Sequence, residues 1–283
     1  MKILLAGCGD VATEAGLRFL AQGHQATAWR RSPEKLPAAF NGQAVDLLAP
    51  ASWPRIDPDT ELVLFTPVPA SRDAAGYEAS YLQAAGQLVA RLKQQCPGLQ
   101  RFIYISSTAV TGGEHGQWVD ESAPYAPARP TAQVLADTEQ LLLDCGLPVT
   151  ILRASGIYGP GRTRLIDQVR TGAARLPSGS HWTNRIHRDD LAAAVVHVAA
   201  LGEAAAPLYL ASDEQPAQLG EVYEFLAAEL GLPVPPASSE AEARAGDRRL
   251  SSQLLRDSGF SFSFPDYRSG YRDILAGAST RHS

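Results

Sequence analysis

The sequence of 283 residues is poor in cysteine and has no apolar run long enough to cross a membrane. Its three cysteines, Cys8, Cys96 and Cys145, lie far apart, which fits neither a disulfide framework nor the spacing of a metal site. The six histidines are equally scattered, and neither HxxxH nor CxxC occurs. A membrane span needs about 20 consecutive apolar residues. We therefore expect a soluble, cytoplasmic protein that binds no metal.

Charge and composition exclude two further classes of protein. Thirty acidic residues against 25 basic ones leave a net charge of −5, so we expect no broad positive surface for nucleic acid. A hydrophobic content of 45% is ordinary for a folded chain and argues against disorder. The length exceeds that of the usual single domain, which favours one large domain or one domain with a smaller partner.

The N-terminal half alternates apolar strands with amphipathic helices. Helices are expected over residues 11–24, 75–95 and 131–145, and strands over residues 2–7, 25–31, 44–48, 61–67, 101–107 and 149–155. Strands that are apolar throughout and separated by helices indicate a parallel sheet covered on both faces. Right-handed crossovers then predict an α/β fold with a doubly wound sheet.

The first strand is followed directly by "GCGDVA", which meets the Gly-x-Gly-x-x-Gly pattern at Gly7 and Gly9 and has Ala12 at the third position. Glycines here let backbone N–H groups and a helix N-terminus approach a pyrophosphate. Strand, motif and helix follow in the required order, so we predict a Rossmann dinucleotide site at Gly7, Gly9, Asp10 and Val11.

The second strand ends in Arg30 and Arg31, about 20 residues after the glycines, where an acidic residue would hold the ribose of NAD. Two guanidinium groups attract a 2′-phosphate, which favours NADP(H) over NAD(H). The alternative is that both are surface arginines.

Further contacts are predicted where the later strands end. Asp46 could accept a hydrogen bond from the adenine amino group, or be a plain loop aspartate. Thr66 and Pro67 should pass under the cofactor with their backbone. Ser106, Ser107 and Thr108 deliver hydroxyls to the carboxyl edge of the sheet, where ligands of doubly wound folds bind. Such hydroxyls can bind a substrate oxygen, which makes Ser107 and Thr108 candidate catalytic residues. The alternative role of these hydroxyls is to cap the next turn.

After Arg153 the pattern becomes irregular. A helix is expected over residues 189–203, a short strand over 207–212, a helix over 219–233, and an exposed loop or short surface helix over 236–247. We predict a Rossmann domain from residues 1–153 and 184–212, and a small discontinuous substrate domain from residues 154–183 and 213–283, placed over the carboxyl ends of the strands.

Several segments together resemble the extended short-chain dehydrogenases/reductases, the group of the NAD-dependent epimerases and dehydratases. They are "GCGDVA", "YISSTAVTG", "LRASGIYGPGR", "RIHRDDLA" and the tail "RRLSSQLLRDSGFSFSFPDYRSG". The resemblance implies that Ala154, Ser155 and Ile157 line the nicotinamide end of the cofactor. It also implies a homodimer through the helices over 75–95 and 131–145, and a structural or domain-closing role for His187 near Asp190.

The chain departs from that family at its catalytic pair. Active members have a tyrosine and, four residues later, a lysine, often followed after four more residues by a glutamate. If Glu139 is that glutamate, Leu135 stands in the lysine slot and Thr131 in the tyrosine slot. No lysine follows Lys93, so another register does not restore the pair. The usual proton relay is therefore predicted to be absent.

One tyrosine could replace the missing proton donor. Tyr125 and Arg129 have the four-residue spacing, but three prolines between residues 124 and 130 oppose a helix there. A loop tyrosine could still reach the site. We expect Asp137 and Glu139 in solvent, and Tyr77 in packing or at an interface.

Two functions remain open. The first is an NADP(H)-binding, atypical family member without demonstrated turnover, which could serve as a cofactor-sensing regulatory protein. The second is an active NADP-dependent reductase, epimerase or dehydratase with a relocated proton donor. A nucleotide-sugar-like or small carbonyl substrate would suit the second, and basic residues for such a substrate are available at Arg162, Arg164, Arg175 and Arg185.

Overall fold

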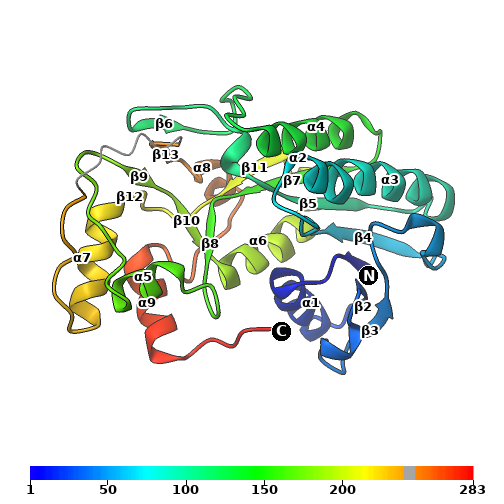
Figure 1. Ribbon diagram of the computed structural model, residues 1–283. Helices are drawn as coiled ribbons and strands as arrows, with labels where there is room; N and C mark the ends of the chain where they lie inside the picture. Colours follow the sequence, from blue (N-terminus) through cyan, green and yellow to red (C-terminus); the bar gives the residue numbers. More distant parts are fainter. Residues whose placement is uncertain (239–245, 283) are drawn as a thin grey trace.

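A seven-stranded parallel sheet forms the centre of the computed structural model, which describes residues 1–238 and 246–282 (Figure 1). The strand order is β11-β7-β5-β4-β1-β2-β3. The bounds are β1 Lys2–Ala6, β2 Gln25–Arg30, β3 Asn41–Ala44, β4 Thr60–Phe65, β5 Arg101–Ser107, β7 Val149–Ala154 and β11 Leu208–Ala211. The predicted α/β fold with a doubly wound sheet is confirmed.

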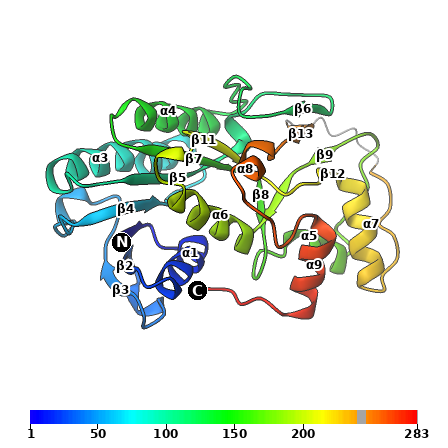
Figure 2. The same cartoon turned by 180° about the vertical axis from the view of Figure 1, so that it is seen from behind.

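Helices cover both faces of this sheet. On one face α1 (Asp10–Ala21) packs beside α6 (Arg188–Ala200), as Figure 2 shows from behind. On the other face lie α4 (Pro130–Asp144) and a continuous helical stretch of α2 (Ala74–Tyr77), the π-helical η3 (Glu78–Gln83) and α3 (Ala84–Gln95). The predicted helix over residues 75–95 therefore exists, with a π-helical segment in its middle.

The alternation of side chains along each buried strand builds two cores. In β1, Ile3 and Leu5 belong to the core under α1 and α6, whereas Leu4 and Ala6 belong to the core under α3 and α4. Successive side chains of a strand point to opposite faces, so a strand covered on both faces must be apolar at every position. This explains the uninterrupted apolar runs in the sequence.

The third strand was predicted too late in the chain. The expectation was residues 44–48, but β3 is Asn41–Ala44 and pairs with β2. Beyond it, the Asp46 carboxylate accepts a hydrogen bond from the backbone N–H of Leu48 at 3.0 Å, and its carbonyl accepts one from Ala49. An aspartate that bonds the backbone two residues on makes a turn, which ends the strand despite the apolar residues that follow.

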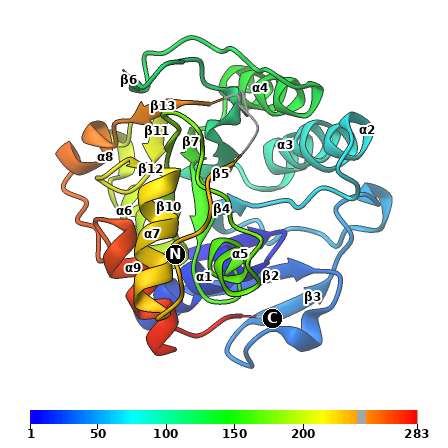
Figure 3. The same cartoon turned by 60° about the vertical axis from the view of Figure 1, so that its left-hand side comes forward.

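The remaining elements form a smaller layer at the end of the molecule away from α3 (Figures 1 and 3). Helices α5 (Arg164–Arg170), α7 (Leu219–Glu229) and α9 (Tyr267–Ala276) share a core of their own. The short strands pair as β8 (Gly156–Tyr158) with β10 (Arg185–His187), β9 (Trp182–Thr183) with β12 (Ala217–Gln218), and β6 (Gln117–Val119) with β13 (Arg248–Leu250).

Short helical segments complete the chain: α8 (Gln253–Asp257), η1 (Pro33–Lys35), η2 (Pro50–Ser52), η4 (Thr108–Val110) and η5 (Gly202–Ala204). The predicted exposed segment over residues 236–247 lies for the most part outside the described residues. Within residues 1–238 and 246–282, no helix has the length and apolar character that crossing a membrane requires.

Candidate functional site

The turn after β1 accepts only glycine at its first position. Gly7 has φ +87°, and a Cβ added there would lie 2.8 Å from the carbonyl oxygen of Thr66. The Thr66 hydroxyl donates a hydrogen bond to the Gly7 carbonyl at 2.8 Å, which joins the ends of β1 and β4. A Cβ on Gly9 would meet no atom closer than 4.0 Å. The backbone at Gly9 is therefore open to a ligand in front of α1.

A cavity of about 330 Å³ lies beside this turn, at the ends of β2 and β3. The predicted residues Gly7, Gly9, Arg30, Arg31, Asp46 and Pro67 all line it. Ser32 and Lys35 line it too and were missed, although their position just after the two arginines was a usable signal. Three cationic side chains thus meet at one end of the glycine turn.

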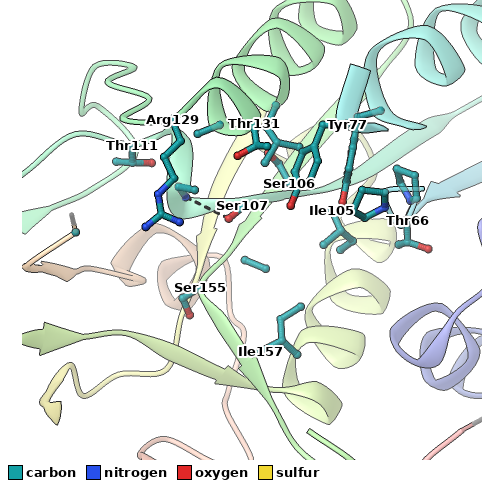
Figure 4. A pocket seen from close by; sticks show the side chains of 18 of the residues that line it. Thr66, Tyr77, Ile105, Ser106, Ser107, Thr111, Arg129, Thr131, Ser155 and Ile157 are labelled. Carbon is teal, nitrogen blue, oxygen red and sulfur yellow. Dashed lines mark hydrogen bonds between the residues drawn. The ribbon is translucent and has the colours of Figure 1, made fainter. Parts of the chain in front are cut away.

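A larger cavity of about 700 Å³ adjoins the first, since Gly9, Pro67 and Val68 line both. The ends of β4, β5 and β7 open into it, and Figure 4 shows their side chains converging on it. Its lining includes the predicted residues Asp10, Val11, Thr66, Ser106, Ser107, Ala154, Ser155 and Ile157. Thr108, predicted beside Ser107, does not line either cavity among the described residues; it begins η4.

The charge of Asp10 at the start of α1 is balanced by two arginines. Its carboxylate accepts a hydrogen bond from buried Arg188 and lies 3.3 Å from the Nε of Arg162. The backbone N–H of His282 also donates to it at 3.2 Å. An anionic ligand at the helix N-terminus would therefore not meet an uncompensated carboxylate.

The helix that should hold the catalytic pair does face the larger cavity. Thr131 and Leu135 of α4 line it. Leu135 is 5% exposed and packs against Val110, with Tyr77 and Tyr81 beside it. No lysine lines this cavity among the described residues. Leu135, which we predicted in the lysine position, therefore makes an apolar contact.

The expectation that Glu139 lies in solvent was wrong, whereas Asp137 is exposed as expected. Glu139 is 0% exposed, and its carboxylate accepts hydrogen bonds from the Nε and Nη2 of Arg153 at 2.7–3.2 Å. The Ser106 hydroxyl also donates to it. Residues four apart share a helix face, so Glu139 lies on the same inward side of α4 as Leu135, one turn later. There Arg153 of β7 supplies the compensating charge.

Tyr125 belongs to this buried pair rather than to the cavity. Its hydroxyl donates a hydrogen bond to Glu139 at 2.8 Å, and the Arg153 guanidinium lies 4.6 Å from its ring centre. Burial and the neighbouring Glu139 carboxylate raise the pKa of Tyr125 to about 12. In the described part of the chain it lines neither cavity. The phenol is thus held as a hydrogen-bond donor to a carboxylate.

Ser107 and His187 each cap a helical segment. The Ser107 hydroxyl accepts a hydrogen bond from the backbone N–H of Ala109 at 3.2 Å, so it caps η4 while lining the cavity. His187 is fully buried and its Nδ1 accepts from the N–H of Asp189 at 3.3 Å, which caps α6. Asp190 instead accepts from the backbone of Ser263 and Phe264.

Of the four arginines suggested for a substrate, Arg162 alone lines the larger cavity. Arg175 bonds to nearby backbone carbonyls, and buried Arg185 stacks over the ring of Tyr267. Arg129 and Arg248 line that cavity and were not proposed for a substrate, because their approach to the site is set by contacts distant in sequence. Within residues 1–238 and 246–282, no group of three His, Cys, Asp or Glu side chains could hold a metal ion.

Comparison with known proteins gives one family. Residues 11–209 match the NAD dependent epimerase/dehydratase family. A solved structure of a putative NAD-dependent epimerase/dehydratase from Methylobacillus flagellatus is 34% identical, with a TM-score of 0.81 and 98% of each chain covered. Protein YeeZ of Escherichia coli K12 is 27% identical over 94% of this chain and 97% of its own length.

More distant structures share the fold. MoeE5, solved in complex with UDP-glucose and NAD, is 21% identical, with a TM-score of 0.80 and 98% of each chain covered. This likeness shows that the two chains share the same fold over nearly their whole length.

Proposed function

The chain belongs to the NAD-dependent epimerase/dehydratase family, and we propose that it is an NADP(H)-binding member that lacks the usual tyrosine–lysine proton relay. The observation that carries the cofactor preference is the cationic end of the smaller cavity, where Arg30, Arg31 and Lys35 meet. Guanidinium groups bind a phosphate through paired hydrogen bonds, and an ammonium adds a point charge. A 2′-phosphate at this end of the glycine turn would match all three.

The residues present also suit the rest of a dinucleotide. Gly7 and Gly9 leave the backbone open in front of α1, whose N-terminal N–H groups favour a pyrophosphate. The balanced charge of Asp10 removes a repulsion there. The adjoining larger cavity has room for the nicotinamide end between the ends of β5 and β7. Bound NADP(H) would supply or accept hydride.

Binding constants for NADPH and NADH test the proposal. We expect NADPH to bind at least about tenfold more tightly than NADH. The double variant Arg30→Ala/Arg31→Ala should weaken NADPH binding by about 10- to 100-fold and leave NADH binding nearly unchanged. Exposed Arg55, which lines neither cavity, gives the matched control Arg55→Ala. Equal affinities for the two cofactors in the unaltered protein would refute the NADP(H) assignment.

A second candidate is an active oxidoreductase with a relocated proton donor, and Tyr77 favours it. Tyr77 lines the larger cavity beside Thr131, and its ring stacks on Tyr81 with centroids 5.1 Å apart (Figure 4). Reduction of a carbonyl needs a proton at the oxygen, and a phenol in the cavity could donate it.

Turnover of a panel of carbonyl substrates with NADPH separates the candidates. Tyr77→Phe should abolish turnover if Tyr77 donates the proton, while Tyr125→Phe should leave it in place. Tight NADPH binding without turnover of any substrate would favour the regulatory binding protein.

A further inference from the structure

We infer that the larger cavity contains an oxyanion site built by Arg129 and Arg248, which binds a carboxylate or phosphate group of the substrate. The inference rests on the proposed function, since the anion would share the cavity with the nicotinamide end of the cofactor. It adds a substrate class: a small metabolite with an anionic group close to the reacting carbon.

Arg129 is the first of the two cations. It precedes α4 and is exposed, and its guanidinium extends into the cavity near Ser107 and Thr111 (Figure 4). Among the described residues its side chain has no hydrogen-bond, ion-pair or ring partner. A guanidinium that reaches into a cavity without a protein acceptor is available to a ligand.

Arg248 approaches the same chain segment from β13. Its Nη2 donates a hydrogen bond to the carbonyl oxygen of Thr108, directly after Ser107. Its Nε is buried and has no hydrogen-bond partner in residues 1–238 and 246–282. Burial lowers the pKa of Arg248, because the charged form is partly removed from water. One bond thus orients the side chain, and an anion would compensate its charge.

Among the described residues, the other charged groups that line the cavity do not neutralise these two arginines. Asp10 and Arg162 are engaged with each other. The Glu114 side chain is 80% exposed and lies 3.7 Å from His115, out toward solvent. The described residues of this cavity therefore leave it positive, although the whole chain carries a net charge of −5.

The chemistry of the two arginines selects the ligand class. A guanidinium fork matches the two oxygens of a carboxylate or phosphate, and the bond is stronger when both partners are charged. A neutral carbonyl or hydroxyl compound would leave both charges uncompensated. The Ser107 hydroxyl lines the same cavity and can donate a further hydrogen bond to an oxyanion, whereas the Ser155 hydroxyl already donates to the carbonyl oxygen of Ala211.

Titration of anions into the protein saturated with NADP+, followed by calorimetry, tests the site. The bound cofactor already occupies Arg30 and Arg31, so an added anion cannot bind there. The probes are malonate, inorganic phosphate and neutral malonamide. We expect malonate or phosphate to bind and malonamide not to. The tighter of the two anions distinguishes a carboxylate substrate from a phosphorylated one.

The variants Arg129→Gln and Arg248→Gln should each raise the anion Kd by about 10- to 100-fold, and Arg55→Gln should leave it unchanged. The Arg129 side chain is exposed and has no partner among the described residues, so its variant tests the site even if Arg248→Gln is unstable. Equal binding of malonamide, or an anion Kd unaffected by Arg129→Gln, would overturn the inference. Failure of NADP+ to bind at all would refute the proposed function instead, and that binding is measured first.

Discussion

The buried pair of Glu139 and Arg153 offers the sharpest test of how this site is supported. Their side chains are 0% and 2% exposed, and the carboxylate receives Nε at 3.0–3.2 Å and Nη2 at 2.7 Å. Replacing Arg153 by Met removes these donors and leaves a buried carboxylate with the hydroxyls of Ser106 and Tyr125. Removing one member of a buried pair costs about 3–5 kcal/mol of stability.

The double variant Glu139→Leu/Arg153→Met removes both charges and should be less damaging than the sum of the single variants. Each single variant leaves an uncompensated buried charge, and the double variant leaves none. We therefore expect a coupling free energy of at least about 2 kcal/mol between the two positions. The double variant will still lose some stability, because the hydroxyls of Ser106 and Tyr125 no longer have the Glu139 carboxylate as acceptor.

Urea unfolding followed by circular dichroism gives the free energies of the four proteins. The exposed pair Arg272–Glu229, with side chains 60% and 29% exposed at 2.8 Å, is the matched control. Its coupling should stay below about 1 kcal/mol, because solvent screens exposed ion pairs. If the costs at Glu139 and Arg153 add to within about 0.5 kcal/mol, the two side chains are independent and this account of the buried pair is refuted.

Three further predictions follow from single positions. Gly7→Ala should abolish NADPH binding and cost at least about 1–2 kcal/mol of stability, since alanine disfavours φ +87° and its Cβ would lie 2.8 Å from a carbonyl oxygen; titration and urea unfolding measure both. Leu135→Ala should lower the free energy of unfolding by about 2 kcal/mol in urea. This is near the lower limit for replacing a buried leucine, because the side chain already borders a cavity, and a loss near zero would contradict its packing role. Burial raises the pKa of Asp213 well above its ordinary value, so the folded state holds the proton more tightly and stability should fall as pH rises above about 4. Asp213→Asn should flatten the fall of the unfolding free energy above about pH 4, and an unchanged slope would exclude Asp213 as its source.

The order of helices and strands could be predicted from the sequence, because apolar runs and turn motifs are local features of the chain. Apolar runs such as β4 and β5 are continuous, and the glycine turn follows β1 directly. The same local logic failed at residues 44–48, where the apolar composition suggested a strand. The Asp46 side chain competes there for backbone N–H groups, and a pattern of apolar residues does not include that competition.

The charged residues of the site could not be assigned in the same way. From the sequence, Glu139 is expected on the solvent side of α4. In the structure it is paired with Arg153, which lies 14 positions later on β7. Arg129 and Arg248 are separated by more than 100 residues, and only the folded chain brings both to one cavity. A buried or ligand-binding charge is defined by its partners, and these are set by tertiary contacts.

The proposed absence of the tyrosine–lysine relay and the two cavity arginines have separate consequences for chemistry. Leu135 makes an apolar contact and supplies no positive charge to the larger cavity. Arg129 and Arg248 carry positive charge elsewhere in the same cavity, where it can hold an oxyanion but cannot donate a proton near neutral pH. Substrate binding can therefore survive in a chain whose proton transfer depends on a different group. For that reason, anion affinity and turnover should respond to different variants, the first to Arg129→Gln and the second to Tyr77→Phe.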